Sequence, residues 1–227
     1  MKVIVIGGNA AGMSAAARIK RKSPDTEVVV YEKSGEVSYG ACGLPYYIGG
    51  ENNEIDLVRI KKPADFESAG IRIRLNCTVV KVEPEAKTIC VYDQAANTEM
   101  NDGFDRILIA SGSSSVIPNI EGVRLDGVFT LKTIADAEAI KARLLRPETE
   151  KVVIVGGGYI GLEVAEACVR RGMKEIHIIE ALDSLVPAFD SEFSEAVRHR
   201  LEAHDVQVHT SQRVIRIEGC DHVESIV

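Results

Sequence analysis

Two segments of this 227-residue chain repeat one pattern: an apolar strand, a glycine-rich turn and a helix-forming stretch. The segments are Lys2–Ile6, Gly7–Gly12 and Met13–Lys22 in the first copy, and Lys151–Val155, Gly156–Gly161 and Leu162–Arg171 in the second. Each copy then enters another apolar strand, which ends at Glu32 in the first copy and at Glu180 in the second. Uninterrupted apolar strands are typical of parallel sheets that are covered on both faces, so the pattern predicts an α/β fold.

The two turns follow, with one departure, the G-x-G-x-x-G spacing of a dinucleotide-binding turn. The first glycine permits a tight turn, the middle one lets the backbone approach a pyrophosphate, and the third lets helix pack on strand. The acid that ends the next strand accepts hydrogen bonds from ribose hydroxyls. We therefore predict two Rossmann-like dinucleotide-binding units, both incomplete toward the C-terminal end. The predicted cofactor-binding residues are Gly7, Asn9, Ala10, Ala11, Gly12 and Glu32 in the first unit, and Gly156, Gly158, Tyr159, Ile160, Gly161 and Glu180 in the second.

The middle position of the turn differs between the copies, because the first has Asn9 and the second has Gly158. This difference favours two different dinucleotides over two copies of one. Glu180 would repel a 2′-phosphate, and Ala181 beside it offers no arginine to bind one. The second unit is therefore predicted to favour NADH over NADPH.

The region between the two copies contains shorter strands with alternating apolar and polar residues. Ile71–Arg74, Thr78–Glu83 and Thr88–Tyr92 predict a β-meander inserted at about residues 71–100. Another buried strand begins at Asp105 and runs into a turn of small residues, and Pro118–Gly122 is a predicted loop and domain boundary. The expected domains are thus 1–118 and 119–227.

Composition excludes several classes of protein. A net charge of −7 does not favour nucleic acid or an anionic membrane as a partner. No apolar run approaches the ~20 residues that span a bilayer, and the chain enters its first strand without a signal sequence. The five cysteines are odd in number and lack metal spacing, and no histidines fall in a ligand spacing. We expect a cytoplasmic protein without disulfides or a metal ion.

One cysteine lies in an unusual setting, between two glycines in the segment Ser38–Tyr47. A disulfide-exchange centre is commonly a C-x-x-C pair, but the nearest other cysteine to Cys42 is Cys77. Redox chemistry at Cys42 therefore requires other partners, such as a flavin on one side and a substrate sulfur or peroxide on the other.

These features together resemble the FAD-dependent pyridine nucleotide-disulfide oxidoreductases, over essentially the whole chain. Ala110-Ser111-Gly112 is similar to the A-T-G turn of that family, with Ser in place of Thr. The resemblance implies that the first unit binds FAD and that the second binds NAD(P)H. It adds a set of residues near the FAD: Lys33, Val79, Ala110, Ser111 and Gly112.

Within this family, Ser38–Tyr47 is similar to the single-cysteine branch of coenzyme A disulfide reductase and related persulfide reductases. NADH peroxidases and water-forming NADH oxidases carry a histidine in the first glycine turn, where this chain has Ala10. Alanine cannot act as a general acid or base, so reduction of peroxide or of oxygen is less favoured as the function. The resemblance implies electron flow from NADH through FAD to Cys42, which forms a mixed disulfide with coenzyme A. The thiolate then attacks the next disulfide or persulfide.

Candidate substrate residues lie on the first predicted helix. Ser14, Arg18 and Arg21 share one helix face, and they match positions that contact coenzyme A in the resembled reductase, as does Ser38. A solvated helix face is the alternative. The reductase often has Asn before its cysteine, where this chain has Ala41.

Two residues of the second unit keep alternative interpretations. By resemblance Tyr159 gates the nicotinamide pocket, but it could also be a packing residue. Glu163 orients the nicotinamide amide, or else lies in the first helical turn, where an acid suits the helix dipole.

The resemblance also implies a longer protein, with a returning A-x-G-D segment and a C-terminal domain that forms a homodimer and completes the coenzyme A site. This chain alone is therefore expected to have little activity. The alternatives to a disulfide or persulfide reductase are an NADH oxidase or peroxidase and, in another class, a non-catalytic nucleotide-binding fragment or redox sensor.

Overall fold

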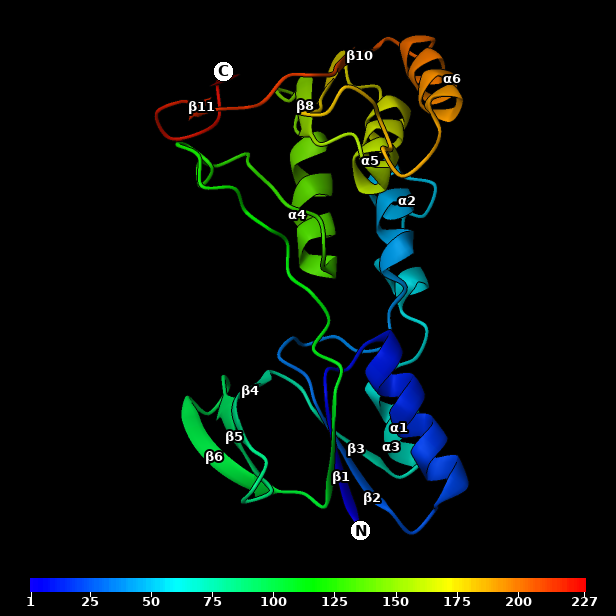
Figure 1. Cartoon of the computed structure of the whole chain (residues 1–227), viewed down its shortest axis with the longest axis vertical. Helices are drawn as coiled ribbons and strands as arrows, with labels where there is room; N and C mark the ends of the chain where they lie inside the picture. Colours follow the sequence, from blue (N-terminus) through cyan, green and yellow to red (C-terminus); the bar gives the residue numbers. More distant parts are fainter. The chain divides into compact units, whose positions relative to one another are not determined.

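The computed structural model describes all residues 1–227, and they form two compact units (Figure 1). The first unit contains Met1–Gly40 and Asp56–Ser113, and the second contains Ala41–Ile55 and Ser114–Val227. Each unit contains a parallel sheet with a β-α-β segment around a glycine turn. The predicted α/β class with two Rossmann-like units is confirmed.

The first unit is built on a four-stranded parallel sheet in the order β3-β2-β1-β7. Its strands are β1 (Lys2–Ile6), β2 (Glu27–Tyr31), β3 (Ile71–Arg74) and β7 (Arg106–Ile109). Its helices are α1 (Ala10–Lys22), α3 (Pro63–Ser68) and the short 3₁₀ turn η2 (Ile55–Val58), whose first residue belongs to the second unit. β2 and β7 flank β1 in register, so the glycine turn after β1 lies at the carboxyl edge of the middle of the sheet.

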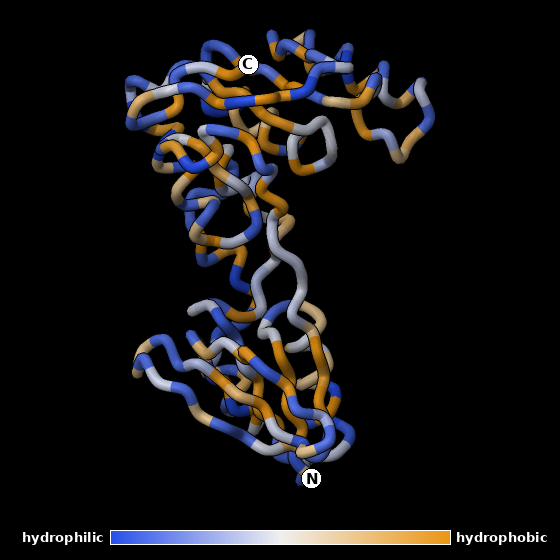
Figure 2. Tube along the Cα trace, turned by 60° about the vertical axis from the view of Figure 1, so that its left-hand side comes forward, coloured by the Kyte–Doolittle hydropathy of each residue, from blue (hydrophilic) through white to orange (hydrophobic).

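Both faces of this sheet are covered, as the apolar strands predicted. Val3 and Val5 pack with Met13 of α1 and Phe66 of α3 on one face. Ile4, on the other face, packs in a second cluster with residues of an antiparallel three-stranded meander. Figure 2 shows hydrophobic residues running along these strands. The alternation of side chains across the sheet thus gives two separate cores in one unit.

The meander consists of β4 (Cys77–Glu83), β5 (Thr88–Asp93) and β6 (Thr98–Gly103). The predicted insertion at about 71–100 therefore needs a correction at its start. Ile71–Arg74 is not part of the meander but pairs in parallel with β2, as the edge strand β3 of the main sheet. Its alternating pattern arises because Arg72 and Arg74 point away from the α-helical core, while Ile71 and Ile73 are buried in it.

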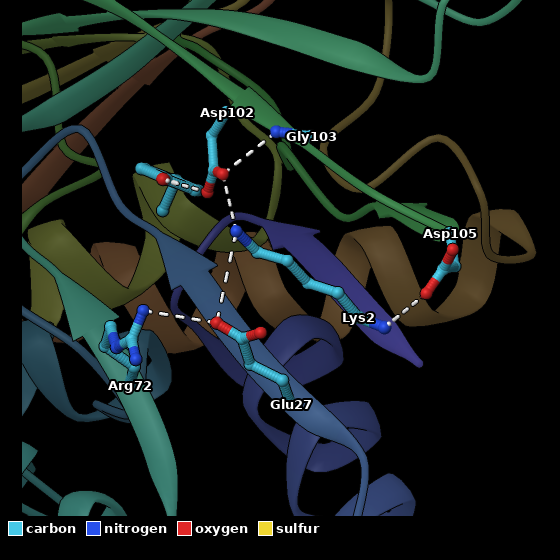
Figure 3. A network of polar contacts seen from close by, with 7 residues as sticks. Lys2, Glu27, Arg72, Asp102, Gly103 and Asp105 are labelled. Carbon is cyan, nitrogen blue, oxygen red and sulfur yellow. Dashed lines mark hydrogen bonds and ion pairs between the residues drawn. The ribbon is translucent and has the colours of Figure 1, made fainter.

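A polar network joins the meander to the parallel sheet (Figure 3). Asp102 accepts hydrogen bonds from the Lys2 ammonium at 2.5 Å and from the Tyr31 hydroxyl at 2.7 Å. Partial burial acts to raise the pKa of Asp102, but the hydrogen bonds from Lys2 and Tyr31 outweigh it and leave that pKa lowered. Burial, together with Asp102, raises the pKa of the Tyr31 hydroxyl. The carboxylate is therefore the form that this network stabilises.

Replacing Asp102 with asparagine is expected to lower the free energy of unfolding by about 1–2 kcal/mol at pH 7, because charge-assisted hydrogen bonds are lost. The folded-state pKa lies below the unfolded value, so this stabilisation is fully present above about pH 4. It is lost as the pH falls through the folded pKa. Urea unfolding of both proteins at pH 7 and at acid pH measures the effect. The control Glu83→Gln breaks an exposed pair with Lys81 in the same meander and should leave stability nearly unchanged, because solvent screens such a pair. A difference between wild type and Asp102→Asn that persists in acid would contradict the assignment.

The second unit is built on the parallel sheet β10-β9-β8. Its strands are β8 (Lys151–Val155), β9 (Glu175–Ile179) and β10 (Val206–His209), with a separate antiparallel pair β11 (Ile217–Glu218) and β12 (Ser225–Ile226). Its helices are α2 (Leu44–Gly49), α4 (Ile134–Leu144), α5 (Tyr159–Arg170) and α6 (Ser191–Glu202), with the 3₁₀ turn η1 (Ala41–Gly43) before α2. No helix in either unit combines the length and the apolar character that crossing a bilayer requires.

The segment 41–55 departs from the expected domain boundaries, which put it in the domain 1–118. In the structure it clusters with the second unit, because α2 packs against α4 and α5. Leu44, Pro45 and Ile48 of α2 are buried there. Figure 1 shows α2 beside α5. The second unit also begins at residue 114, before the predicted loop Pro118–Gly122.

Candidate nucleotide and thiol site

The first glycine turn has the tight geometry that its spacing predicted. Gly7 adopts φ of 107°, in the region that favours glycine. A Cβ on Gly7 would lie 2.1 Å from the Ala110 carbonyl oxygen, and one on Gly12 would lie 1.9 Å from the Gly7 carbonyl oxygen. No side chain fits at either position. The turn after β7 thus lies directly against the glycine turn.

Glu32 faces this turn from the end of β2. One carboxylate oxygen accepts the Gly8 N–H at 2.7 Å, and the other accepts the backbone N–H and the hydroxyl of Ser34, each at 2.8 Å. A carboxylate offers about four acceptor positions, so one remains for a ribose hydroxyl. These bonds hold the carboxylate against the glycine turn.

The second turn repeats the main contacts of this arrangement. Gly156 has φ of 111°, and a Cβ on Gly161 would lie 2.1 Å from the Gly156 carbonyl oxygen. Glu180 accepts the Gly157 N–H at 2.7 Å with one oxygen and the Leu182 N–H at 2.8 Å with the other. The two units therefore share local hydrogen bonding as well as sequence pattern.

The middle position of the turn separates the two units. A Cβ on Gly158 would meet no atom within 4 Å, so open space lies over the second turn. In the first turn the Asn9 side chain makes no helix cap, and its Oδ1 accepts the backbone N–H of Tyr39 at 3.2 Å. The second turn therefore leaves room for a dinucleotide, and in the first turn the Asn9 side chain is held by the segment before Cys42.

Both nucleotide helices begin earlier than predicted. α1 begins at Ala10 rather than Met13, and α5 at Tyr159 rather than Leu162. The third glycine of each turn therefore lies inside its helix. Glu163 consequently lies beyond the first turn of α5, which corrects the alternative that placed it there for the helix dipole.

Tyr159 and Ile160 are both more than half exposed at the start of α5. The ring of Tyr159 packs edge-on against Phe189, with ring centroids 5.8 Å apart. No sequence motif marks Phe189, and its role beside Tyr159 follows from this ring contact. Glu163 is exposed one turn further on.

The remaining residues that the resemblance added near the FAD are spread over the first unit. Gly112 has φ of 68°, and a Cβ there would meet open space. Lys33 is exposed beside Glu32, and its carbonyl accepts the Gln94 side chain at 3.0 Å. Val79 lies in β4 and packs against the core beneath the meander. Their roles toward FAD stay predictions.

Cys42 is exposed in η1, directly before α2. All five cysteines are free. Burial raises the pKa of the Cys168 thiol to about 12 and also raises that of Cys77. Burial likewise raises the pKa of Cys90, near Glu99. Since the thiolate is the nucleophile, these three are poor candidates, and Cys220 is the other exposed thiol.

The predicted substrate residues of α1 lie on one exposed helix face: Ser14, Arg18 and Arg21. Arg21 also lines a hollow of about 310 Å³ between α1 and α3. The other residues that line the hollow are not predicted from the sequence, because the fold brings them together: Ala17, Lys20, Lys61, Asp65, Phe66, Ala69 and Ile71. The hollow thus has three cations, one carboxylate and an aromatic ring.

Ser38 is the substrate residue predicted outside α1. It adopts a left-handed φ of 51°. Its N–H donates to the Gly8 carbonyl at 2.9 Å, and its carbonyl accepts the Ile60 N–H at 2.8 Å. These bonds hold a backbone conformation that costs a non-glycine residue about 1 kcal/mol or more.

Two units with glycine turns and facing acids define an α/β protein that binds dinucleotides, here with an exposed cysteine. The family profile described as pyridine nucleotide-disulphide oxidoreductase matches residues 1–227. The chain belongs to this family.

Three relatives illustrate the likeness. The NAD(P)H sulfur oxidoreductase (CoA-dependent) of Pyrococcus abyssi is 39% identical over 99% of this chain and 49% of its own length. An NADH oxidase of Methanocaldococcus jannaschii is 34% identical over 100% of this chain and 50% of its own. The structure of an NAD-dependent persulfide reductase from A. fulgidus matches with a TM-score of 0.93 and 37% identity, over 97% of this chain and 42% of that one. The chain thus spans about half the length of the curated relatives it matches.

Proposed function

We propose that this chain provides the nucleotide sites and the reactive thiol of an NADH-dependent flavoprotein that reduces a coenzyme A disulfide or persulfide. The observation that carries the proposal is the attachment of the Cys42 segment to the first glycine turn. Ser38 and Tyr39 donate their backbone N–H groups to Gly8 and Asn9. Only two residues separate Tyr39 from Cys42, and three Cα–Cα steps limit their Cα separation to about 11 Å. The thiol is thereby tethered near the turn that we assign to FAD.

Each part of the chain has a role in this proposal. The first turn with Glu32 would hold FAD, and the second turn with Glu180 would hold NADH. When bound, FAD supplies the relay of an electron pair from NADH to the Cys42 disulfide. The Cys42 thiolate attacks one sulfur of coenzyme A disulfide, the S–S bond breaks, and one coenzyme A thiolate leaves. Reduction of the mixed disulfide by the electron pair and a proton releases the second thiol and restores Cys42.

The substrate assignment rests on the cations of α1. The phosphates of coenzyme A require positive partners, and Arg18 and Arg21 offer them on the same exposed face as Ser14. The basic hollow beside Arg21 provides space for a phosphorylated nucleotide with Phe66 as an apolar wall. Ser38, beside the first turn, completes the proposed set.

Replacing Arg21 with glutamate is expected to lower the rate at which Cys42 reacts with coenzyme A disulfide by about tenfold or more, because a charge-assisted phosphate contact becomes repulsive. The rate with glutathione disulfide, which has no phosphate, should stay unchanged. The control Lys22→Glu makes the same charge change at an exposed position outside the hollow. Equal losses in both variants would indicate a general charge effect and count against the hollow.

Intact mass spectrometry of the non-reduced protein, after incubation with coenzyme A disulfide, tests the central proposal. The expected product has one coenzyme A adduct, which peptide mapping locates on Cys42. Titration of FAD against the protein should also give saturable binding. No adduct on Cys42, or an adduct that forms equally on Cys220, would refute the proposed chemistry.

An NADH oxidase is the second candidate, since the M. jannaschii relative carries that name at 34% identity. Ala10 in the first turn provides no acid or base for oxygen chemistry, and this disfavours it. Comparing oxygen uptake with release of coenzyme A thiol under NADH separates the two. The proposal further includes a cytoplasmic, reducing location, in keeping with five free cysteines, and a homodimeric assembly of the longer protein.

A further inference from the structure

The helix that follows Cys42 is fixed at its far end by a side chain of the second unit. Arg171 is the residue at the C-terminal cap of α5, and its Nε donates to the Ile48 carbonyl of α2 at 2.6 Å. Carbonyl groups in the last turn of a helix lack partners within the helix. Arg171 therefore donates a hydrogen bond to one of these carbonyl groups from the neighbouring helix α5, and this bond ties α2 to α5.

The backbones of α2 and α5 lie close together around this bond. A Cβ on Gly49 would lie 3.1 Å from the Cα of Ala167, so the two helix backbones approach closely. Gly50 ends α2 with φ of 88°, and a Cβ there would lie 2.8 Å from the Arg171 Cζ. The guanidinium packs directly on the backbone of Gly50, which adopts a left-handed φ that favours glycine.

The packing of Arg171 against α2 lowers the stability of the folded state. The Nη2 of Arg171 is enclosed and has no hydrogen-bond partner, and an enclosed donor without a partner lowers the stability of the folded state. A second cation lies nearby: burial lowers the pKa of Lys141, and the charge of Arg171 lowers it further. Lys141 is held over the Tyr47 ring, 3.6 Å from its centroid. An apolar side chain of similar volume would fill the space beside α2 without these costs.

From this geometry we infer that Arg171 is a positioning residue for Cys42: it fixes α2 on α5 and so sets where the thiol meets its disulfide substrate. Only Gly43 separates Cys42 from the start of α2. Displacement of the helix therefore moves the thiol directly. This inference rests on the proposed function, because the substrate it concerns is coenzyme A disulfide.

Two reagents with different requirements separate positioning from general reactivity. Iodoacetamide is small and reacts with any exposed thiolate, so its rate reports the chemical state of Cys42 alone. Coenzyme A disulfide must be bound while the thiolate attacks its sulfur, so its rate also depends on where Cys42 lies. The ratio of the two rates therefore reports the position of Cys42 relative to its bound substrate, separately from the reactivity of the thiol. Peptide mapping of Cys42 adducts over time gives both rates in the full chain.

Replacing Arg171 with methionine is expected to lower the coenzyme A disulfide rate by about tenfold or more, while the iodoacetamide rate and NADH binding stay unchanged. Arg171→Lys, which retains a donor, should restore part of the loss. Gly50→Ala should reproduce it independently, because its Cβ displaces the guanidinium. The control is Arg200→Met, which removes an exposed arginine of α6 in the same unit.

The outcomes are distinguishable. An unchanged ratio of rates in both Arg171→Met and Gly50→Ala would overturn the positioning role and leave the proposed function standing. The same loss in Arg200→Met would overturn it too, since it would then be a general effect of charge. A wild-type chain that reacts no faster with coenzyme A disulfide than with glutathione disulfide would overturn the proposed substrate, and the positioning role with it.

Discussion

Replacing Cys42 with serine is expected to abolish disulfide exchange with coenzyme A disulfide, a loss of at least about 100-fold. A serine hydroxyl stays protonated at neutral pH and cannot form a disulfide, so neither attack nor the mixed disulfide is possible. Incubation with coenzyme A disulfide followed by intact mass measurement reports the loss. Binding of FAD and NADH should persist, because no contact of either glycine turn includes the Cys42 side chain.

Cys220 provides the matched control, since it is the other exposed cysteine and lies between β11 and β12. Cys220→Ser should leave exchange unchanged. Full adduct formation in Cys42→Ser would mean that another thiol is the nucleophile, and loss of nucleotide binding would mean that the variant is misfolded. Retained nucleotide binding without any disulfide chemistry in the wild type would favour the binding-module alternative.

Two alanine substitutions in the second glycine turn should have opposite consequences. Gly161→Ala places a Cβ 2.1 Å from the Gly156 carbonyl oxygen, so strand and helix must separate, and we expect a loss of about 2–3 kcal/mol in stability. Gly158→Ala places a Cβ in open space, and the φ of −80° suits alanine. This variant should be as stable as wild type within about 0.5 kcal/mol. Its NADH affinity should nonetheless fall about tenfold or more, because the Cβ occupies the approach of the pyrophosphate.

Urea unfolding and NADH titration of both variants measure this contrast. If Gly158→Ala bound NADH as tightly as wild type, the open space over the turn would not be the nucleotide site. If Gly161→Ala were fully stable, the close helix–strand contact would be adjustable.

Local features of the fold could be predicted from the sequence because each depends on residues close along the chain. The glycine turns, the acids that end the following strands and the shared face of Ser14, Arg18 and Arg21 are of this kind. The helices α1 and α5 begin three residues before the predicted starts, because the third glycine of each motif is helical and not part of the turn. The pattern of β3 predicts a strand of the meander, since periodicity shows which residues alternate but not which strand they pair with.

Other parts of the candidate site depend on contacts between distant segments. The basic hollow joins α1 to Lys61 and Phe66, which no motif marks. Phe189 is recognisable only through its ring contact with Tyr159. Arg171 and Ile48 are far apart in sequence, and nothing in either segment indicates their hydrogen bond.

Cys42 shows the division most clearly. The sequence by itself determined that two dinucleotide units accompany one unpaired cysteine, because glycine spacing and strand-end acids are local constraints on the backbone. Only the tertiary structure decided that the segment after Cys42 packs with the second unit, while the segment before it is bonded to the first glycine turn. The physical reason is burial: the apolar residues of α2 and the close approach of Gly49 to Ala167 select α5 as their neighbour. That selection is a property of two complementary surfaces, which a linear pattern does not contain.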